Sequence, residues 1–253
     1  MNHPQVDITK VSLFCTCIID QLYPEVGTSV VNVLRQYGCE VDFPLNQTCC
    51  GQPLYNSGFT KESKKLALKV LNDFAHSNYV IVPSGSCAAM MRNFYLDLFY
   101  NDQKNHPRAV SFAKKVYEFS EFLVRVLNIQ GSEAKYTGKG TYHPSCHLLR
   151  EIGEREAPEI LLRNVVGLEL VDLPQAEYCC GFGGSFSIKY PHISEAMGTD
   201  KLENVISTGA DSLISCDMGC LMQVGGLLSR NGSKIQIRHL SQILDQEIHS
   251  AGS

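Results

Sequence analysis

The chain has 253 residues, a formal net charge of −4 and a pI of about 6.1. It therefore lacks the basic surface that neutralises phosphate groups, and nucleic acid and anionic membranes are poor candidates for partners. With 44% hydrophobic and 19% charged residues, the composition is that of an ordinary soluble globular protein.

No apolar run reaches the roughly 20 residues that are needed to cross a bilayer, and the amino terminus lacks the apolar core of a signal peptide. We therefore expect a cytoplasmic location and no transmembrane segment. In that reducing compartment, eleven cysteines favour metal or redox chemistry over disulfides.

The first half of the chain is predicted to alternate strands and helices. The apolar spacing and the glycine and proline stops predict strands at residues 11–14, 39–43 and 79–82 and helices at 26–37 and 66–74. A Cys-Cys-Gly loop at 49–51 lies between the second strand and the second helix. Such alternation is typical of βαβ units that build a parallel sheet.

The second half repeats this order. Its strands are predicted at residues 140–146, 168–173 and 212–215, its helices at 149–164 and 202–209, and its Cys-Cys-Gly loop at 179–181. The segment that begins at Val116 is likewise echoed by the one that begins at Ile237, and Ser120 and Ser241 are expected to cap the helices there. The fold prediction is therefore an internally duplicated α/β protein, with halves at 1–131 and 132–250 and a tail or cloning remnant at 251–253.

The cysteines follow the same duplication. Each Cys-Cys-Gly is preceded by one cysteine and followed by another at nearly equal spacings, and this gives two sets of four: Cys17, Cys49, Cys50 and Cys87, then Cys146, Cys179, Cys180 and Cys220. All of them follow a predicted strand, so they should gather where the carboxyl ends of parallel strands meet. Gly51 and Gly181 should allow a tight turn that brings N–H groups near the sulfurs.

Four soft thiolates in each half suit an iron–sulfur cluster. A single zinc ion is the main competitor, although two vicinal cysteines bind one ion awkwardly. Thiol and disulfide chemistry without a metal is the remaining alternative. We therefore predict an iron–sulfur cluster, one or two per chain, on these eight cysteines.

Several motifs resemble a known family. They are "CCGQPLYNSG", "PSGSC", "YHPSCH", "CCGFGGSFS" and "GCLMQVGG", which are similar to motifs of the cysteine-rich CCG domain family. That family includes the CCG-domain subunit of heterodisulfide reductase and the iron–sulfur subunits of glycolate oxidase and anaerobic glycerol-3-phosphate dehydrogenase. The resemblance covers nearly the whole chain and is strongest for the lactate-utilisation branch.

That resemblance implies an iron–sulfur electron-transfer component of a system that oxidises L-lactate to pyruvate together with lactate utilisation proteins B and C. The fuller CCG pattern ends each repeat in Cys-x-x-Cys, but here Ser84 and Asp217 occupy the first position of that ending. A [4Fe–4S] cluster is therefore the simpler expectation than a noncubane one. Cys216, next to Asp217, is a weaker candidate ligand, and its alternative is an ordinary buried cysteine.

His143 and His147 flank Cys146 and are weak candidates for a proton acceptor or a substrate-binding group. Their simpler interpretation is loop histidines that bond to the backbone. Two rival functions remain open: a disulfide reductase of the heterodisulfide reductase type, and a zinc-stabilised scaffold without catalytic activity. No flavin or nicotinamide motif is recognisable in the sequence.

Overall fold

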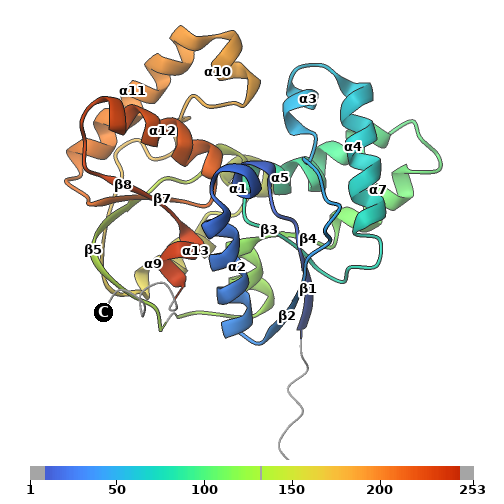
Figure 1. The fold of residues 1–253 in the computed structure, drawn as a ribbon, viewed down its shortest axis with the longest axis horizontal. Coiled ribbons are helices and arrows are strands. Elements are labelled where there is room, and N and C mark those ends of the chain that lie inside the picture. Colours follow the sequence, from blue (N-terminus) through green and yellow to red (C-terminus); the bar gives the residue numbers. More distant parts are fainter. Residues whose placement is uncertain (1–8, 132, 246–253) are drawn as a thin grey trace, which may run out of the picture.

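The computed structural model describes residues 9–131 and 133–245, so the predicted tail at 251–253 lies outside the described residues. Within these ranges the chain forms two four-stranded sheets, and every strand pair is parallel (Figure 1). In spatial order, the first sheet contains β2 (Cys39–Asp42), β1 (Thr9–Leu13), β3 (Val80–Val82) and β4 (Val116–Glu118). The second contains β6 (Val166–Val171), β5 (Lys135–Tyr142), β7 (Ser212–Ser215) and β8 (Gln236–His239).

Helices follow the strands in both halves, and η marks those with π geometry. The first half contains α1 (Cys17–Leu22), α2 (Pro24–Gln36), α3 (Gln52–Asn56), α4 (Thr60–Asp73), α5 (Gly85–Ala89), η1 (Met90–Phe94), α6 (Tyr95–Phe99), α7 (His106–Ala113), α8 (Phe119–Glu121) and η2 (Phe122–Val126). The second contains η3 (His147–Ile152), α9 (Glu156–Arg163), α10 (Ser185–Lys189), α11 (Pro191–Ser207), α12 (Met218–Arg230) and α13 (Leu240–Leu244). No helix of the described part is long and apolar enough to cross a membrane.

The two sheets share one topology. In each, the first strand of the half pairs with the second on one side and with the third on the other, and the fourth strand lies beyond the third. Leu13 is in register with Ile81, and Tyr142 is in register with Ile214 at the same place in the second sheet. This repeated order confirms the predicted internal duplication and the α/β class.

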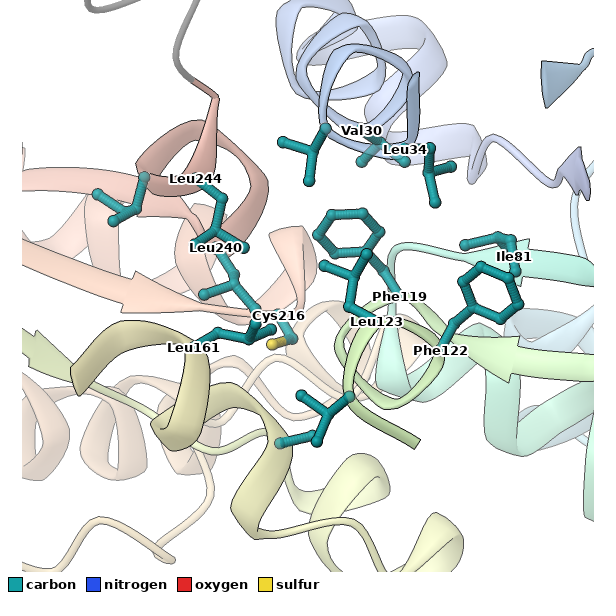
Figure 2. Close-up of a cluster of buried hydrophobic side chains, with 14 of the residues drawn as sticks. Val30, Leu34, Ile81, Phe119, Phe122, Leu123, Leu161, Cys216, Leu240 and Leu244 are labelled. Atoms are coloured by element: carbon teal, nitrogen blue, oxygen red, sulfur yellow. The ribbon is translucent and has the colours of Figure 1, made fainter. Parts of the chain in front are cut away.

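The two halves are joined by a common hydrophobic core. Helix α2 of the first half packs against α13 of the second, and α9 of the second packs against α8 and η2 of the first. Figure 2 shows Leu34, Phe119, Leu161, Cys216 and Leu244 in this core, and all of them are 1% exposed or less. Because each half supplies part of the same buried cluster, burial of apolar surface holds the halves in one arrangement.

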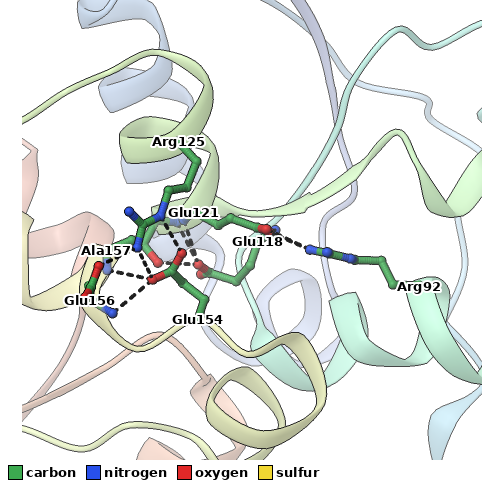
Figure 3. A network of polar contacts seen from close by, with 8 residues as sticks. Arg92, Glu118, Glu121, Arg125, Glu154, Glu156 and Ala157 are labelled. Atoms are coloured by element: carbon green, nitrogen blue, oxygen red, sulfur yellow. Dashed lines mark hydrogen bonds and ion pairs between the residues drawn. The ribbon is translucent and has the colours of Figure 1, made fainter.

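A polar network also links the halves (Figure 3). Arg125 of η2 forms ion pairs with Glu154 at 2.9 Å and with Glu156 at 3.0 Å, both in the second half. A carboxylate oxygen of Glu154 accepts hydrogen bonds from the N–H groups of Glu156 and Ala157, both at 2.9 Å. These bonds satisfy backbone donors at the beginning of α9, which would otherwise lack partners.

Two local expectations are wrong. Residues 149–164 do not form one helix, because Gly153 adopts a φ of +79° and separates η3 from α9. Ser120 and Ser241 are not the helix caps. The caps are Glu118 and His239, whose side chains accept hydrogen bonds from the N–H groups of those two serines.

Candidate metal centre

The two cysteine sets gather at the carboxyl ends of their sheets, as the sequence predicts. Cys17 begins α1 after β1, and Cys87 lies in α5 after β3. Cys146 and Cys220 follow β5 and β7 in the same way. A single cavity of about 670 Å³ is lined by all eight cysteines of the two sets, Cys17, Cys49, Cys50, Cys87, Cys146, Cys179, Cys180 and Cys220.

In the first set, the sulfurs are in close contact. The Sγ atoms of Cys17 and Cys49 lie 3.7 Å apart, and those of Cys50 and Cys87 lie 3.3 Å apart. Gly51 has a φ of +89°, a conformation that L side chains rarely adopt, and its N–H lies 3.5 Å from the Sγ of Cys49. The predicted tight turn with an N–H near sulfur is therefore present.

The second Cys-Cys-Gly loop repeats the turn of the first. Gly181 has a φ of +84°, and its N–H lies 3.4 Å from the Sγ of Cys179. The carbonyl of Gly181 accepts a hydrogen bond of 2.8 Å from Ser194, and that of Gly51 accepts one of 3.1 Å from Ser63. Since Ser63 and Ser194 lie in the helices that follow the two loops, each loop is fixed to its own helix.

One cysteine of each set is suited to be the thiolate. A hydrogen bond from Cys17, followed by one from Cys50, lowers the pKa of Cys49 to about 3. In the second set, the largest contribution is a hydrogen bond from Cys146, and it lowers the pKa of Cys179 to about 2. The same contacts raise the pKa of Cys17 and of Cys146. A metal ion can bind such a thiolate and then displace the protons of the neighbouring thiols.

The clustered cysteines are donors of the kind that bind metal ions or iron–sulfur clusters. All eleven cysteines lie in the described residues and none forms a disulfide. Sulfurs that approach to 3.3 or 3.7 Å without a bond are suited to share metal ions, and the N–H groups of Gly51 and Gly181 can donate to thiolate ligands. The clustering therefore supports metal binding by both sets.

Ser84 and Asp217, which replace the fifth cysteine of the fuller pattern, bond to each other between the halves. The hydroxyl of Ser84 donates to the carboxylate of Asp217 at 3.0 Å, and the N–H of Ser86 donates to the same oxygen at 3.0 Å. The other oxygen accepts the N–H of Gly219 at 3.0 Å, and Ser84 accepts the N–H of Cys87 at 3.2 Å. Both replaced positions are therefore helix caps, and both line the cavity.

His143 is fully enclosed beside the second set. It is 1% exposed, and one of its ring nitrogens lies within 4.8 Å of the Sγ atoms of Cys180 and Cys220. Burial, followed by the charge of Lys201, lowers the pKa of His143 to about 4, against the opposing effect of the Ala176 carbonyl. The Ala176 backbone is near enough to oppose this lowering, but neither ring nitrogen forms a well-directed hydrogen bond with the described residues.

His147 lies on the cavity wall and connects the two halves. Its Nδ1 lies 3.6 Å from the Sγ of Cys146, and its Nε2 lies 3.3 Å from the amide nitrogen of Gln52. The bonds of His147 are thus to side chains, and not to the backbone as the simpler interpretation required. Gln52 follows the first Cys-Cys-Gly, so this contact joins that loop to the segment that carries Cys146.

The remaining cysteines lie away from the cavity lining. Cys216 is fully buried in the core between the halves, and its Sγ is 3.6 Å from the hydroxyl of Tyr142. Burial raises the pKa of Cys15 and of Cys39 to about 11. The cavity lining includes none of these three cysteines.

Sequence reasoning missed two residues close to the cysteines. Lys201 is 1% exposed, and its ammonium group donates to the carbonyls of Gln175 and Ala176 at 2.9 and 3.0 Å. The hydroxyl of Tyr95 donates to the carbonyl of Cys50 at 2.9 Å. Lys201 could have been noticed as a lysine at an apolar position of its helix, but Tyr95 carries no such signal.

A family model described as "Cysteine-rich domain", CCG, matches the chain twice, at residues 11–92 and 140–225. A protein of Geobacillus sp. strain WCH70 named "Lactate utilization protein A" is 48% identical over 93% of this chain and 99% of its own length. Proteins of the same name from Shouchella clausii and Halalkalibacterium halodurans are 49% and 47% identical, each over 94% of this chain and 99% and 97% of their own lengths.

Among solved structures, a hypothetical protein from Helicobacter pylori resembles the fold, with a TM-score of 0.58 and 14% identity over 100% of this chain and 50% of that one. At this identity the likeness concerns the fold alone. The repeated cysteine geometry, the two matches of the family model and the high identity over nearly whole lengths lead to one conclusion. The chain belongs to the cysteine-rich CCG domain family and, within it, to the group of the lactate utilization A proteins.

Proposed function

We propose that this chain is the iron–sulfur electron-transfer component of a multi-protein system that oxidises L-lactate to pyruvate. Its partners are lactate utilisation proteins B and C. One cluster is held by each cysteine set, and [4Fe–4S] is the simplest type because each set has four cysteines. The observation that carries the proposal is the single cavity onto which all eight cysteines open.

The proposal has two further supports. The relatives that match over nearly their whole length are named for lactate utilization. In each half, a backbone N–H lies near the sulfur of the cysteine with the lowered pKa, an arrangement that stabilises negative charge on a metal-bound thiolate.

The oxidation of L-lactate requires acceptors for two electrons. Conversion of L-lactate to pyruvate releases two electrons and two protons, and an iron–sulfur cluster supplies one-electron transfer when bound. The residues of this chain hold two such sites against one cavity, and Cys17 of the first set is exposed whereas no cysteine of the second set is. The first site therefore reaches the surface at which a partner can dock.

The proposal is tested by reconstitution from purified components. This chain alone should not oxidise L-lactate at a useful rate, whereas the mixture with proteins B and C should. Replacing Cys179 and Cys180 by serine should abolish that activity and prevent growth on L-lactate but not on pyruvate. Cys39→Ser is the matched control, since this buried cysteine lies outside the cavity lining and its replacement should leave growth unchanged.

Other outcomes would favour the rival functions. Turnover of disulfides by the chain alone, with no effect of lactate, would indicate a disulfide reductase of the heterodisulfide reductase type. A colourless zinc protein would indicate a scaffold. Normal growth of the Cys179→Ser, Cys180→Ser strain on L-lactate would reject the proposal.

A further inference from the structure

The internal duplication allows the surroundings of the two cysteine sets to be compared position by position. The N–H groups of Phe14 and His143 donate to the carbonyls of Ile81 and Ile214, at 2.9 and 2.8 Å, at the same place in each sheet. Phe14 precedes Cys17 by as many residues as His143 precedes Cys146. His143 is therefore the counterpart of Phe14.

A second difference lies on the helix that follows each Cys-Cys-Gly loop. The buried residues of α4 occur at the same offsets from Ser63 as the first four buried residues of α11 from Ser194, and these two serines bind the loop carbonyls. At one of these offsets, α4 has Val70 and α11 has Lys201, both 1% exposed or less.

The first site is therefore enclosed by apolar side chains and the second by two nitrogen-bearing ones. Phe14 and Val70 pack in the same buried cluster as Cys50 and Cys87, and the ring of Phe14 lies 5.7 Å from that of Phe74. In the second half, the imidazole of His143 faces the equivalent pair of sulfurs instead.

The imidazole of His143 has no hydrogen-bond partner in this position. It is 1% exposed, and a buried polar group without partners requires an explanation. Lys201 donates to the nearby carbonyl of Ala176, so that carbonyl already has a hydrogen-bond donor. The two sulfurs within 4.8 Å remain as the groups with which His143 can share a metal ion.

We propose that His143 is a protein ligand of the metal centre held by the second cysteine set, so that this centre has nitrogen and sulfur ligands while the first has sulfur ligands only. The inference rests on the proposed metal-binding function. A neutral imidazole adds no negative charge to the four thiolates, and the positive charge of the buried Lys201 beside this set raises the reduction potential of an iron–sulfur centre there. The second centre should therefore be the more easily reduced of the two.

The test uses full-length protein that is labelled with ¹⁵N-histidine and reconstituted anaerobically with iron and sulfide. A Cys49→Ser, Cys50→Ser background leaves only the second set intact. Pulsed EPR of the reduced protein should show the strong ¹⁵N coupling of a bound imidazole. His143→Phe, which introduces the residue of the first half, should abolish this coupling and change the potential.

Two further variants separate ligation from folding. His192→Phe should retain the strong coupling, because His192 is exposed and lies outside the cavity lining. His143→Cys supplies a soft donor at the same position, so it should load with iron but without the nitrogen coupling. Full loading of the second set without any ¹⁵N coupling would overturn the proposal.

A Co²⁺ titration separates failure of this inference from failure of the proposed function. If no iron–sulfur cluster assembles on the wild-type chain, the proposed function fails, but Co²⁺ added to the metal-free protein still reports on the ligands. His143→Phe should then weaken Co²⁺ binding at the second set at least tenfold, while His192→Phe should not. Equal Co²⁺ affinity of the wild-type protein and the His143→Phe variant would overturn the proposal independently.

Discussion

Asp217 is expected to be the polar residue that contributes most to the stability of the contact between the two halves. Its carboxylate accepts three hydrogen bonds of 3.0 Å, from Ser84, Ser86 and Gly219, and the first two cross from the other half. Hydrogen bonds to a charged acceptor each contribute about 1.5–3 kcal/mol, and the loss of several at once is not fully additive. Asp217→Ala should therefore lower the free energy of unfolding by about 3–5 kcal/mol.

A double-mutant cycle on metal-free protein measures the coupling between Ser84 and Asp217. Ser84→Ala should cost about 1–2 kcal/mol, because it removes one donor to Asp217 and the cap that accepts the N–H of Cys87. Urea unfolding of wild type, Asp217→Ala, Ser84→Ala and the double variant should give a coupling free energy of about 1 kcal/mol or more. Asp217→Asn keeps one acceptor and should lie between wild type and Asp217→Ala.

Two results would refute this account of Asp217. One is an Asp217→Ala variant within about 0.5 kcal/mol of wild type, the range of ordinary surface substitutions. The other is strict additivity of the two single changes, since residues that share a hydrogen bond should couple.

Three further predictions concern the loops and the core. Gly181→Ala should destabilise the protein more than Gly38→Ala, although both positions have a positive φ. An added Cβ at Gly181 would lie 2.4 Å from the carbonyl oxygen of Ser194, whereas nothing lies within 4 Å of an added Cβ at Gly38. The strain alone costs about 1–2 kcal/mol, so an equal loss in urea unfolding for both would show that the clash is absent. Burial lowers the pKa of His239 to about 4, so between pH 6.5 and 4 the unfolded state binds more protons and stability should fall as the pH falls. His239→Asn should remove about 3 kcal/mol of that loss, and an unchanged pH profile would contradict the assignment. Finally, burial raises the pKa of Cys216, so iodoacetamide should modify it in urea but not in the native protein, and rapid native labelling would show that the core is open.

Sequence reasoning was successful where the pattern was both periodic and repeated. The apolar run at 212–215 became β7 at Ser212–Ser215, and the predicted helix at 26–37 became α2 at Pro24–Gln36. The two Cys-Cys-Gly loops could be placed at strand ends because their neighbours alternate between strand and helix periods.

It was less successful where tertiary contacts replaced the usual local choice. Serine is a common cap, but Glu118 and His239 cap the two helices instead, and this could not be read from propensity alone. The hydrogen bond between Ser84 and Asp217 joins the two halves. A comparison of motifs shows that these two residues replace cysteines, but it does not show that they contact each other. The same limit concealed Tyr95 and the pairing of His147 with Gln52.

The central claim is that each half holds its own metal centre on four cysteines against one common cavity. The most direct measurement is the content of iron, acid-labile sulfide and zinc per chain after anaerobic preparation of wild type and of the two double variants, Cys49→Ser, Cys50→Ser and Cys179→Ser, Cys180→Ser. The account predicts iron and sulfide in wild type and about half of each in either variant, because the loss of thiolate ligands empties one site while the fold remains. Zinc without iron in wild type, or loss of all iron from a folded double variant, would contradict it.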